Sequence, residues 1–231
     1  MAESGRLQLF RQDELLYQGD HAARVADILL GNTCYHLADR SRGGLLFHAA
    51  ALAWQGFGLL LPGTMGAGKS TLTAWLLGRG FDYLTDELVF IPLGSRVMQT
   101  FPRPLNLKRS ARLVLHDWLD FSRQADHILS SAAIDLVPPV LLNPSSRLSE
   151  PPLSLILFPR YRPGHKFALT SLTKAHTGLE LMQCLVNARN LPEHGFPEIS
   201  RLSKHTPAYK INYSNFDQIG DRIETILGSL L

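Results

Sequence analysis

A glycine-rich stretch that ends in a lysine and two hydroxyl residues carries the clearest chemistry in this sequence. It reads Gly63-Thr64-Met65-Gly66-Ala67-Gly68-Lys69-Ser70-Thr71 and fits the pattern G-x-x-x-x-G-K-[ST] in full. Its glycines let backbone N–H groups surround phosphate oxygens, and the helix that follows adds the positive end of its dipole. Lys69 then reaches the β- and γ-phosphates, and the Ser70 hydroxyl binds Mg²⁺. The stretch predicts a nucleotide phosphate site; the alternative is a glycine-rich hairpin turn with a surface lysine.

Two neighbouring acids follow soon after this loop. Asp86 and Glu87 lie in the middle of an aromatic and aliphatic run, residues 81–91, that is typical of a strand. Burying two carboxylates there is costly unless cations or hydrogen bonds accept them. Since neighbours on a strand point to opposite faces, we expect the two acids to have separate roles or to lie at a bend.

The elements around the loop follow from the flanking pattern. Residues 44–54 are apolar and alanine-rich, residues 55–58 have turn composition, and residues 59–61 are apolar again. This pattern predicts two strands joined by a tight hairpin, the second of which delivers the loop. His48 then lies on the neighbouring strand, close enough to face the site. A helix over residues 69–77 is expected to end at Gly78-Arg79-Gly80.

The rest of the chain predicts an α/β protein. The expected elements are an amphipathic piece at 22–30, a proline-braced basic loop at 101–108, a helix at 110–119, a proline-rich mobile loop at 137–152, strands at 153–158 and 167–172 joined by a basic turn at 159–166, a helix at 175–188, a strand at 208–213 and a closing helix at 216–230. Together they indicate one domain over residues 1–231, with residues 1–43 as an N-terminal cover layer and residues 44–231 as the catalytic core.

Composition limits the class of protein. With 45% hydrophobic and 19% charged residues the 231-residue chain is that of a packed globular protein. The net charge of +3 comes without a dense Lys/Arg tract, so nucleic acid is not an expected partner. Cys34 and Cys184 lack metal-ligand spacing and are expected to be reduced thiols. The N-terminus lacks a signal-peptide layout, and polar residues interrupt the most apolar region, so we expect a cytoplasmic protein without a membrane anchor.

Several motifs together resemble the catalytic domain of the bacterial HPr kinase/phosphorylase family, a fold relative of phosphoenolpyruvate carboxykinase. They are His48 before the loop, Gly63 to Ser70, Arg79-Gly80 with Asp86-Glu87, Arg103-Pro104-Leu105-Asn106, and Arg162-Pro163-Gly164-His165-Lys166. The pattern covers residues 45–172 and is most similar to the HPr-kinase-related group encoded beside small peptide-carrier proteins. It implies a P-loop mixed sheet flanked by helices.

The resemblance also implies roles for individual residues. Asp86 would be the general base that accepts a proton from the attacking hydroxyl, and Glu87 would bind Mg²⁺ together with Ser70. His48 would lie near the transferred phosphoryl group or hold Asp86 in place, and Arg103 would stabilise charge on that group. Each residue also has a purely structural alternative. Asp86 could be a strand acid that is capped by a backbone amide or paired with Arg103, and Glu87 could be an exposed strand glutamate. His48 could be a core histidine, and Arg103 a solvated loop arginine.

Two departures limit what carries over. The second acid is Glu87 where the family has Asp, and about forty residues precede the hairpin, too few for a typical separate domain. The function expected is an ATP- and Mg²⁺-dependent kinase acting on a Ser/Thr hydroxyl of a small protein or peptide, with a homo-oligomer left open. A P-loop ATPase, a small-molecule kinase and a regulatory nucleotide-binding module are the alternatives.

Overall fold

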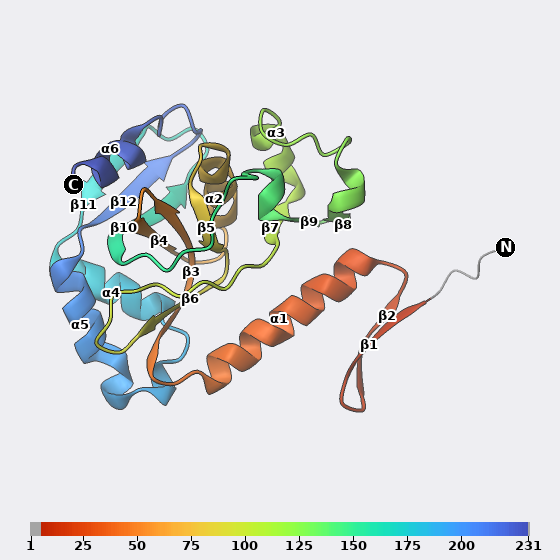
Figure 1. Cartoon of the computed structure of the whole chain (residues 1–231), viewed down its shortest axis with the longest axis horizontal. Helices are drawn as coiled ribbons and strands as arrows, with labels where there is room; N and C mark the ends of the chain where they lie inside the picture. Colours follow the sequence, from red (N-terminus) through yellow and green to blue (C-terminus); the bar gives the residue numbers. More distant parts are fainter. Residues whose placement is uncertain (1–5, 231) are drawn as a thin grey trace.

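The computed structural model describes residues 6–230, and a mixed sheet lies at its centre (Figure 1). The sheet has seven strands in the order β11-β12-β10-β4-β3-β5, with β6 also paired to β3. Their bounds are β11 (Ala168–Ser171), β12 (Ala208–Tyr213), β10 (Leu153–Tyr161), β4 (Phe57–Pro62), β3 (Gly44–Trp54), β5 (Asp82–Thr85) and β6 (Leu88–Pro92). The predicted α/β class with a mixed sheet is confirmed at this level.

The β3–β4 hairpin forms the middle of the sheet, as the sequence pattern predicts. Its strands are antiparallel, and the register runs from Ala49 opposite Pro62 to Trp54 opposite Phe57. The turn places Gln55 and Gly56 at positive φ, which a tight two-residue connection requires. Nearly all of β3 is buried on both faces, so its small alanines allow the layers above and below to pack closely.

Two apolar layers cover the two faces of the sheet. Alternate residues of one strand enter different layers: Leu59 and Leu61 pack beneath α2 (Lys69–Gly78) and α6 (Arg222–Gly228), whereas Leu60 packs against α4 (Lys174–Cys184) and α5 (Phe196–His205). This is the period-two alternation of a strand buried on both sides. Figure 1 shows the two helix pairs on opposite sides of the sheet.

The single strand predicted over residues 81–91 is interrupted, and this prediction was wrong in its continuity. β5 and β6 pair in succession with the same strand β3: Thr85 lies opposite Ala51, and Leu88 lies opposite His48. Asp86 and Glu87 form the bend between them. The bend follows from the cost of carrying two adjacent carboxylates through a sheet that is apolar on both faces.

The basic loop expected at 101–108 is also corrected. Its second half is strand β7 (Leu105–Lys108), which joins β8 (Leu129–Ser130) and β9 (Ile134–Val137) in a small antiparallel sheet. The buried Asp135 carboxylate holds this sheet together by accepting from Arg112, at 2.7 and 2.8 Å, and from Ser130. The predicted helix at 110–119 shrinks to a 3-10 turn (Arg109–Ala111) and α3 (Arg112–Leu115).

The proline-rich segment 137–152, expected as a mobile loop or surface excursion, begins with the last residue of β9 and is tied to the outer edge of β5. Asn143 Nδ2 donates to Phe81 O at 2.9 Å, the Ser146 hydroxyl accepts from Tyr83 N at 2.8 Å, and Arg147 N donates to the Asp82 carboxylate at 2.8 Å. Side chains thus satisfy backbone groups that a further strand would otherwise pair.

The C-terminal part follows the predicted order with altered bounds. Strands 153–158, 167–172 and 208–213 are found as β10, β11 and β12, of which β10 runs on to Tyr161, so the predicted basic turn begins later. The helix predicted at 175–188 ends at Cys184, and the closing helix is reduced to α6. Helix α5 was not predicted, although its buried Ile199, Leu202 and Ser203 lie at helical spacing.

The N-terminal residues form a hairpin and a long helix at the rim of the molecule (Figure 1). Strands β1 (Leu7–Arg11) and β2 (Glu14–Gly19) pair only with each other. Helix α1 (Ala22–Arg40) is longer than the amphipathic piece predicted at 22–30, yet only Ala23 and Cys34 in it are buried. No helix within residues 6–230 combines the length and apolar character that a membrane crossing requires.

Candidate nucleotide and phosphoryl-transfer site

The ends of four strands bring the candidate residues to one edge of the sheet. β10 is parallel to β4 and to β12, whereas β3 is antiparallel to both β4 and β5. Consequently β4, β5, β10 and β12 all run in one direction, and their carboxyl ends lie along the same edge. The glycine-rich loop follows β4 there, and Asp86-Glu87 follow β5. Open α/β sheets bind ligands at this edge.

The loop has the backbone that its glycines predict. Gly66 and Gly68 adopt φ values of +83° and +94°, and Gly68 leads directly into α2. A Cβ at Gly68 would lie 2.6 Å from the Tyr213 hydroxyl and 3.0 Å from Tyr161 Cβ, so only glycine fits. Met65 is 90% exposed at the outer turn. The N–H groups that begin α2 therefore stand at an exposed, glycine-lined turn suited to an anion.

Lys69 lies folded against its own loop. Its Nζ donates to Gly63 O at 2.7 Å and to Thr64 O at 3.3 Å, and the side chain is almost fully buried. Burial lowers the pKa of Lys69, and the negative charges of Asp86 and Glu87 oppose that effect only in part. The predicted phosphate-binding lysine is thus within the electrostatic reach of both acids.

Asp86 is the most unusual titratable group of the site. It is only 2% exposed; its Oδ2 accepts from Asn106 N at 3.2 Å, while its Oδ1 has no hydrogen-bond partner. Burial raises the pKa of Asp86 to about 7, with the Glu87 charge adding to the rise and the bond from Asn106 opposing it. The nearby Ser70 hydroxyl also lowers this pKa. A carboxylate with a pKa near neutrality and a free oxygen is suited to proton transfer.

Glu87 lies between the His48 imidazole and the Arg103 guanidinium. His48 Nε2 is 3.4 Å from one carboxylate oxygen of Glu87, and Arg103 Nη1 is 3.5 Å from the other. Burial raises the pKa of Glu87, but the His48 hydrogen bond and the charges of His48, Arg103 and Lys69 outweigh it and leave the pKa lowered. Unlike its neighbour, Glu87 therefore stays ionised at neutral pH.

These contacts correct two details of the sequence interpretation. Of the two positions expected for His48, near the transferred phosphoryl group or against Asp86, the second is not found: His48 contacts Glu87, because the bend turns Glu87 back toward β3 and Ala49 N donates to Glu87 O at 3.1 Å. Arg103 is 7% exposed, so the alternative of a solvated loop arginine is wrong. The Tyr83 hydroxyl donates to Arg103 O at 2.9 Å and fixes the backbone at this position.

Helix α1 contributes two residues to the site that no sequence motif singles out. Asp27 Oδ1 accepts from Asn106 Nδ2 at 3.0 Å, and Cys34 Sγ lies 3.6 Å from Arg103 Nη1. A third unpredicted neighbour is Cys184 at the end of α4, a buried thiol near the Gly63 backbone and the Lys69 charge. Both cysteines are free, as expected. No local motif marks these residues, since only the fold brings them to the site.

The donor chemistry fits a magnesium-bound triphosphate. Mg²⁺ is usually held by one or two carboxylates together with substrate phosphates rather than by a cage of protein groups. Ser70 and the ionised Glu87 supply oxygen donors of this kind, and the unpartnered Oδ1 of Asp86 is a buried anionic atom that a cation or a proton would satisfy. Within residues 6–230 no group of three His, Cys, Asp or Glu side chains has the arrangement of a metal site.

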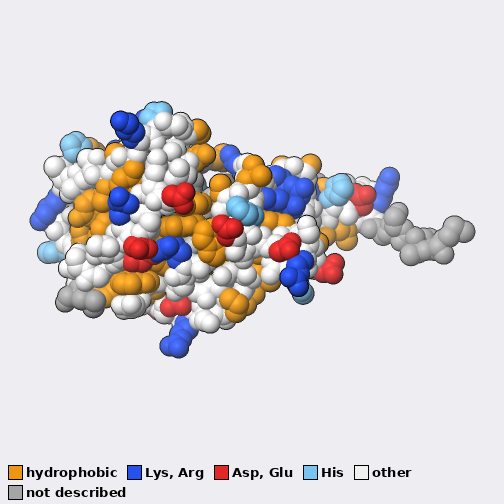
Figure 2. All heavy atoms as spheres, turned by 90° about the horizontal axis from the view of Figure 1, so that it is seen from above, with side chains coloured by type: hydrophobic (Ala, Val, Ile, Leu, Met, Phe, Trp, Pro, Cys, Tyr) orange, Lys and Arg blue, Asp and Glu red, His pale blue; other side chains and the backbone are white. Residues whose placement is uncertain are grey.

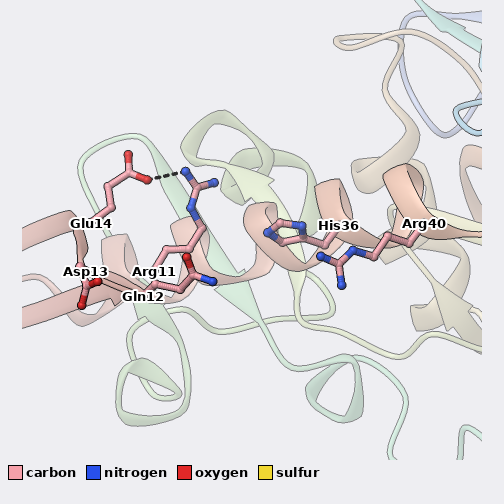
Figure 3. Close-up of a pocket in the computed structure, with 6 residues that line it drawn as sticks. All are labelled: Arg11, Gln12, Asp13, Glu14, His36 and Arg40. Carbon is pink, nitrogen blue, oxygen red and sulfur yellow. Dashed lines mark hydrogen bonds and ion pairs between the residues drawn. The ribbon is translucent and has the colours of Figure 1, made fainter.

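An open hollow away from this edge is found at the N-terminal hairpin. It lies between the tip of the β1–β2 hairpin and the second half of α1 (Figure 3) and is lined by Arg11, Gln12, Asp13, Glu14, His36 and Arg40. Arg11 and Glu14 pair with each other across the hairpin turn. On the face seen in Figure 2, Lys and Arg side chains are mostly scattered among acidic ones.

Comparison with known proteins gives little beyond this geometry. No protein-family model matches the chain, and no curated protein matches it. Among solved structures the chain is similar to the HPr(Ser) kinase/phosphatase from Coxiella burnetii, with 13% identity and a TM-score of 0.36 over 80% of this chain and 94% of the other. A likeness at this level assigns neither a family nor an activity. The function must therefore be argued from the residues of the site.

Proposed function

We propose that this protein is a kinase that uses Mg·ATP to phosphorylate a serine or threonine hydroxyl of a small protein or peptide. The observation that carries the proposal is the meeting of the Gly63–Thr71 loop with Asp86 and Glu87 at one edge of the sheet. The two adjacent acids differ in pKa, one near 7 and one lowered. Separated pKa values of this kind distinguish a proton acceptor from a permanently charged group.

In the proposed reaction the hydroxyl oxygen of the acceptor attacks the γ-phosphorus, the bond to the β–γ bridging oxygen breaks, and ADP leaves. Asp86 accepts the proton of the attacking hydroxyl at its free Oδ1. Lys69 leaves the Gly63 and Thr64 carbonyls and neutralises the phosphates. Bound Mg²⁺, held through Ser70 and Glu87, would supply further positive charge for the transferred group.

Arg103 and His48 act on this arrangement through Glu87. Arg103 Nη1 is shared between the Glu87 carboxylate and the Cys34 thiol, so the guanidinium keeps Glu87 charged from its buried position. His48 holds the other oxygen of Glu87. Glu87 is therefore fixed from both sides, which defines where a cation would be bound. Arg103 also provides a positive charge within the site that can stabilise the transferred phosphoryl group.

A transfer assay with γ-labelled ATP and candidate carrier proteins or precursor peptides tests the proposal. Separation of labelled acceptor from free phosphate distinguishes a kinase from an ATPase that uses water. We expect Asp86→Asn to reduce transfer about 100-fold or more, the typical contribution of a general base. The control is Asp126→Asn, which changes an exposed aspartate outside the site. Transfer that survives Asp86→Asn, or label that appears only as free phosphate, would refute the kinase mechanism.

A further inference from the structure

An exposed tyrosine stands directly beside the phosphate loop and has no role in the proposed chemistry. Tyr161 is the last residue of β10 and is 46% exposed, although the seven residues before Arg160 in that strand are buried. Its backbone N–H donates to Ala67 O at 3.0 Å, and its Cβ limits the space at Gly68. The tyrosine is therefore fixed to the wall of the phosphate loop.

The ring is supported from behind by a row of aromatic side chains. Tyr161 packs edge-on against Tyr213 with 5.8 Å between ring centroids, Tyr213 stacks on Phe216 at 5.9 Å, and Phe216 stacks on Trp75 of α2 at 4.9 Å. Tyr213 and Trp75 are buried, and the Tyr213 hydroxyl donates to Gly68 O at 3.4 Å. Tyr161 is thus the solvent-facing end of a supported row and offers a flat surface at little conformational cost.

The strand order fixes which end of a nucleotide would reach this ring. β3 and β5 lie on one side of β4, and Asp86 and Glu87 are therefore on that side of the loop. β10 and β12 lie on the other side of β4, where Tyr161 and Tyr213 end their strands. A triphosphate whose terminal phosphate faces the acids must leave the loop toward β10. The ribose and the base then arrive at the end of β10.

We propose that Tyr161 is a stacking platform for the purine base of the nucleotide. This inference rests on the proposed function and extends it to the part of the donor that does not react. Aromatic stacking on a base is tolerant of base identity because every base presents a π-face. The exposed Arg162 adjoins the ring, and its backbone N–H donates to Tyr213 O at 2.8 Å. We therefore expect a preference for purine nucleotides over bare polyphosphate and little distinction between ATP and GTP.

Calorimetric titration with two ligands separates the base from the phosphates. The ligands are Mg·ATP and magnesium tripolyphosphate, which shares the phosphate chain and lacks the nucleoside. We expect Tyr161→Ala to weaken the binding of ATP about 10-fold, which is the size of one lost stacking contact. The affinity for tripolyphosphate should change less than about 2-fold. Tyr161→Phe keeps the ring and should bind both ligands as the wild type does. The matched control is Tyr35→Ala, which removes a more exposed tyrosine from α1.

A second variant keeps the proposal testable if Tyr161→Ala folds poorly. In Tyr161→Trp we expect ATP to quench the emission more than it quenches the wild type, whose three native tryptophans give the baseline, while tripolyphosphate changes the two proteins equally. Equal weakening of both ligands in Tyr161→Ala, unchanged ATP binding, or equal quenching by both ligands would overturn the base platform. A wild-type protein that binds ATP selectively but labels no acceptor would refute the kinase and leave the platform standing. Wild-type protein that binds neither ligand would overturn both.

Discussion

At the scale of single residues, the two neighbouring acids show how position divides chemically similar groups. Asp86 is enclosed, bonded by one backbone N–H and left with a free oxygen, whereas Glu87 is partly open and lies between His48 and Arg103. Burial dominates the first and opposite charge dominates the second, so their pKa values move in opposite directions. Adjacent acids with such different environments are suited to different tasks in one reaction.

The raised pKa of Asp86 predicts the pH dependence of phosphoryl transfer. A base must be deprotonated to work, so we expect the rate to rise with pH through about 7, the pKa of Asp86. The measurement is kcat/KM across pH 5.5 to 9 at fixed free magnesium. Residual activity of Asp86→Asn should lack this rise. A wild-type profile that falls over the same interval would contradict the assignment of Asp86 as the base.

The same pKa predicts a pH effect on stability. The folded protein binds the Asp86 proton more tightly than the unfolded chain, where the pKa is near 3.8. The unfolded chain therefore loses its proton first, and this group makes the free energy of unfolding fall as pH rises from about 4 to 7. The conversion is about 1.4 kcal/mol per pKa unit. From pH 5 to pH 8 we therefore expect the free energy of unfolding of Asp86→Asn to rise relative to that of the wild type by on the order of 1–3 kcal/mol. Urea unfolding of both proteins at pH 5 and pH 8 measures this difference. If the variant instead loses stability relative to the wild type as pH rises, burial does not dominate the pKa of Asp86.

Gly68 gives a prediction about space rather than charge. Gly68→Ala places a Cβ 2.6 Å from the Tyr213 hydroxyl in a residue with φ +94°, so we expect at least a 10-fold loss of Mg·ATP affinity together with lower stability. Gly94→Ala is the matched control, because Gly94 also has positive φ but meets nothing within 4 Å. Titration calorimetry and thermal melts compare the two. Equal effects would mean that backbone strain alone matters.

At the scale of elements, helix α1 belongs to the site although it lies at the rim of the fold. Asp27 holds the Asn106 side chain, and the backbone N–H of Asn106 holds Asp86. We expect Asp27→Ala to lower transfer about 3- to 10-fold, on the basis of roughly 1 kcal/mol for one hydrogen bond, and to move the pH profile upward because the bond that lowers the Asp86 pKa is loosened. Asp20→Ala, an exposed acid just before the helix, is the control. A lower rate with an unmoved pH profile would show that Asp27 acts only on the fold.

Which elements could be predicted from the sequence depends on how local their causes are. The β3–β4 hairpin, the turn of the glycine-rich loop and α2 follow from periodicity and glycine spacing, and the strands and α2 are found close to their predicted bounds. The break between β5 and β6 depends on β3 accepting two partners in succession, which is a tertiary fact. The contacts of Asp27 and Cys34 join residues that lie far apart in the chain, so no local pattern indicates them. The energetic cost of burying two adjacent carboxylates did indicate that residues 86 and 87 belong to the candidate site.

At the scale of the whole molecule, stability is distributed unevenly. β3, β4 and β10 are covered on both faces by apolar layers, whereas β1 and β2 form a separate two-stranded sheet that contacts α1 and leaves Leu7, Phe10 and Leu15 exposed. Two-stranded hairpins are marginal by themselves in water. We expect hydrogen exchange to be fastest in residues 7–19 and slowest in β3 and β4. Hairpin protection equal to that of β3 at low protein concentration would contradict this; protection that grows with concentration would instead indicate a homo-oligomer formed through the hairpin.

The ammonium group of Lys69, bonded to two carbonyls of its own loop, has a consequence for selectivity. To pair with Lys69, an incoming anion must replace these two hydrogen bonds. The net binding free energy of an anion that makes few other contacts is therefore small. Inorganic phosphate or a nucleoside monophosphate would make few contacts with the loop. A triphosphate would make contacts along the whole loop, and these offset the cost of breaking the two Lys69 bonds. In the proposed kinase, the resting position of Lys69 therefore lowers the affinity for every anion by the same displacement cost, and a ligand with many contacts to the loop offsets that cost best.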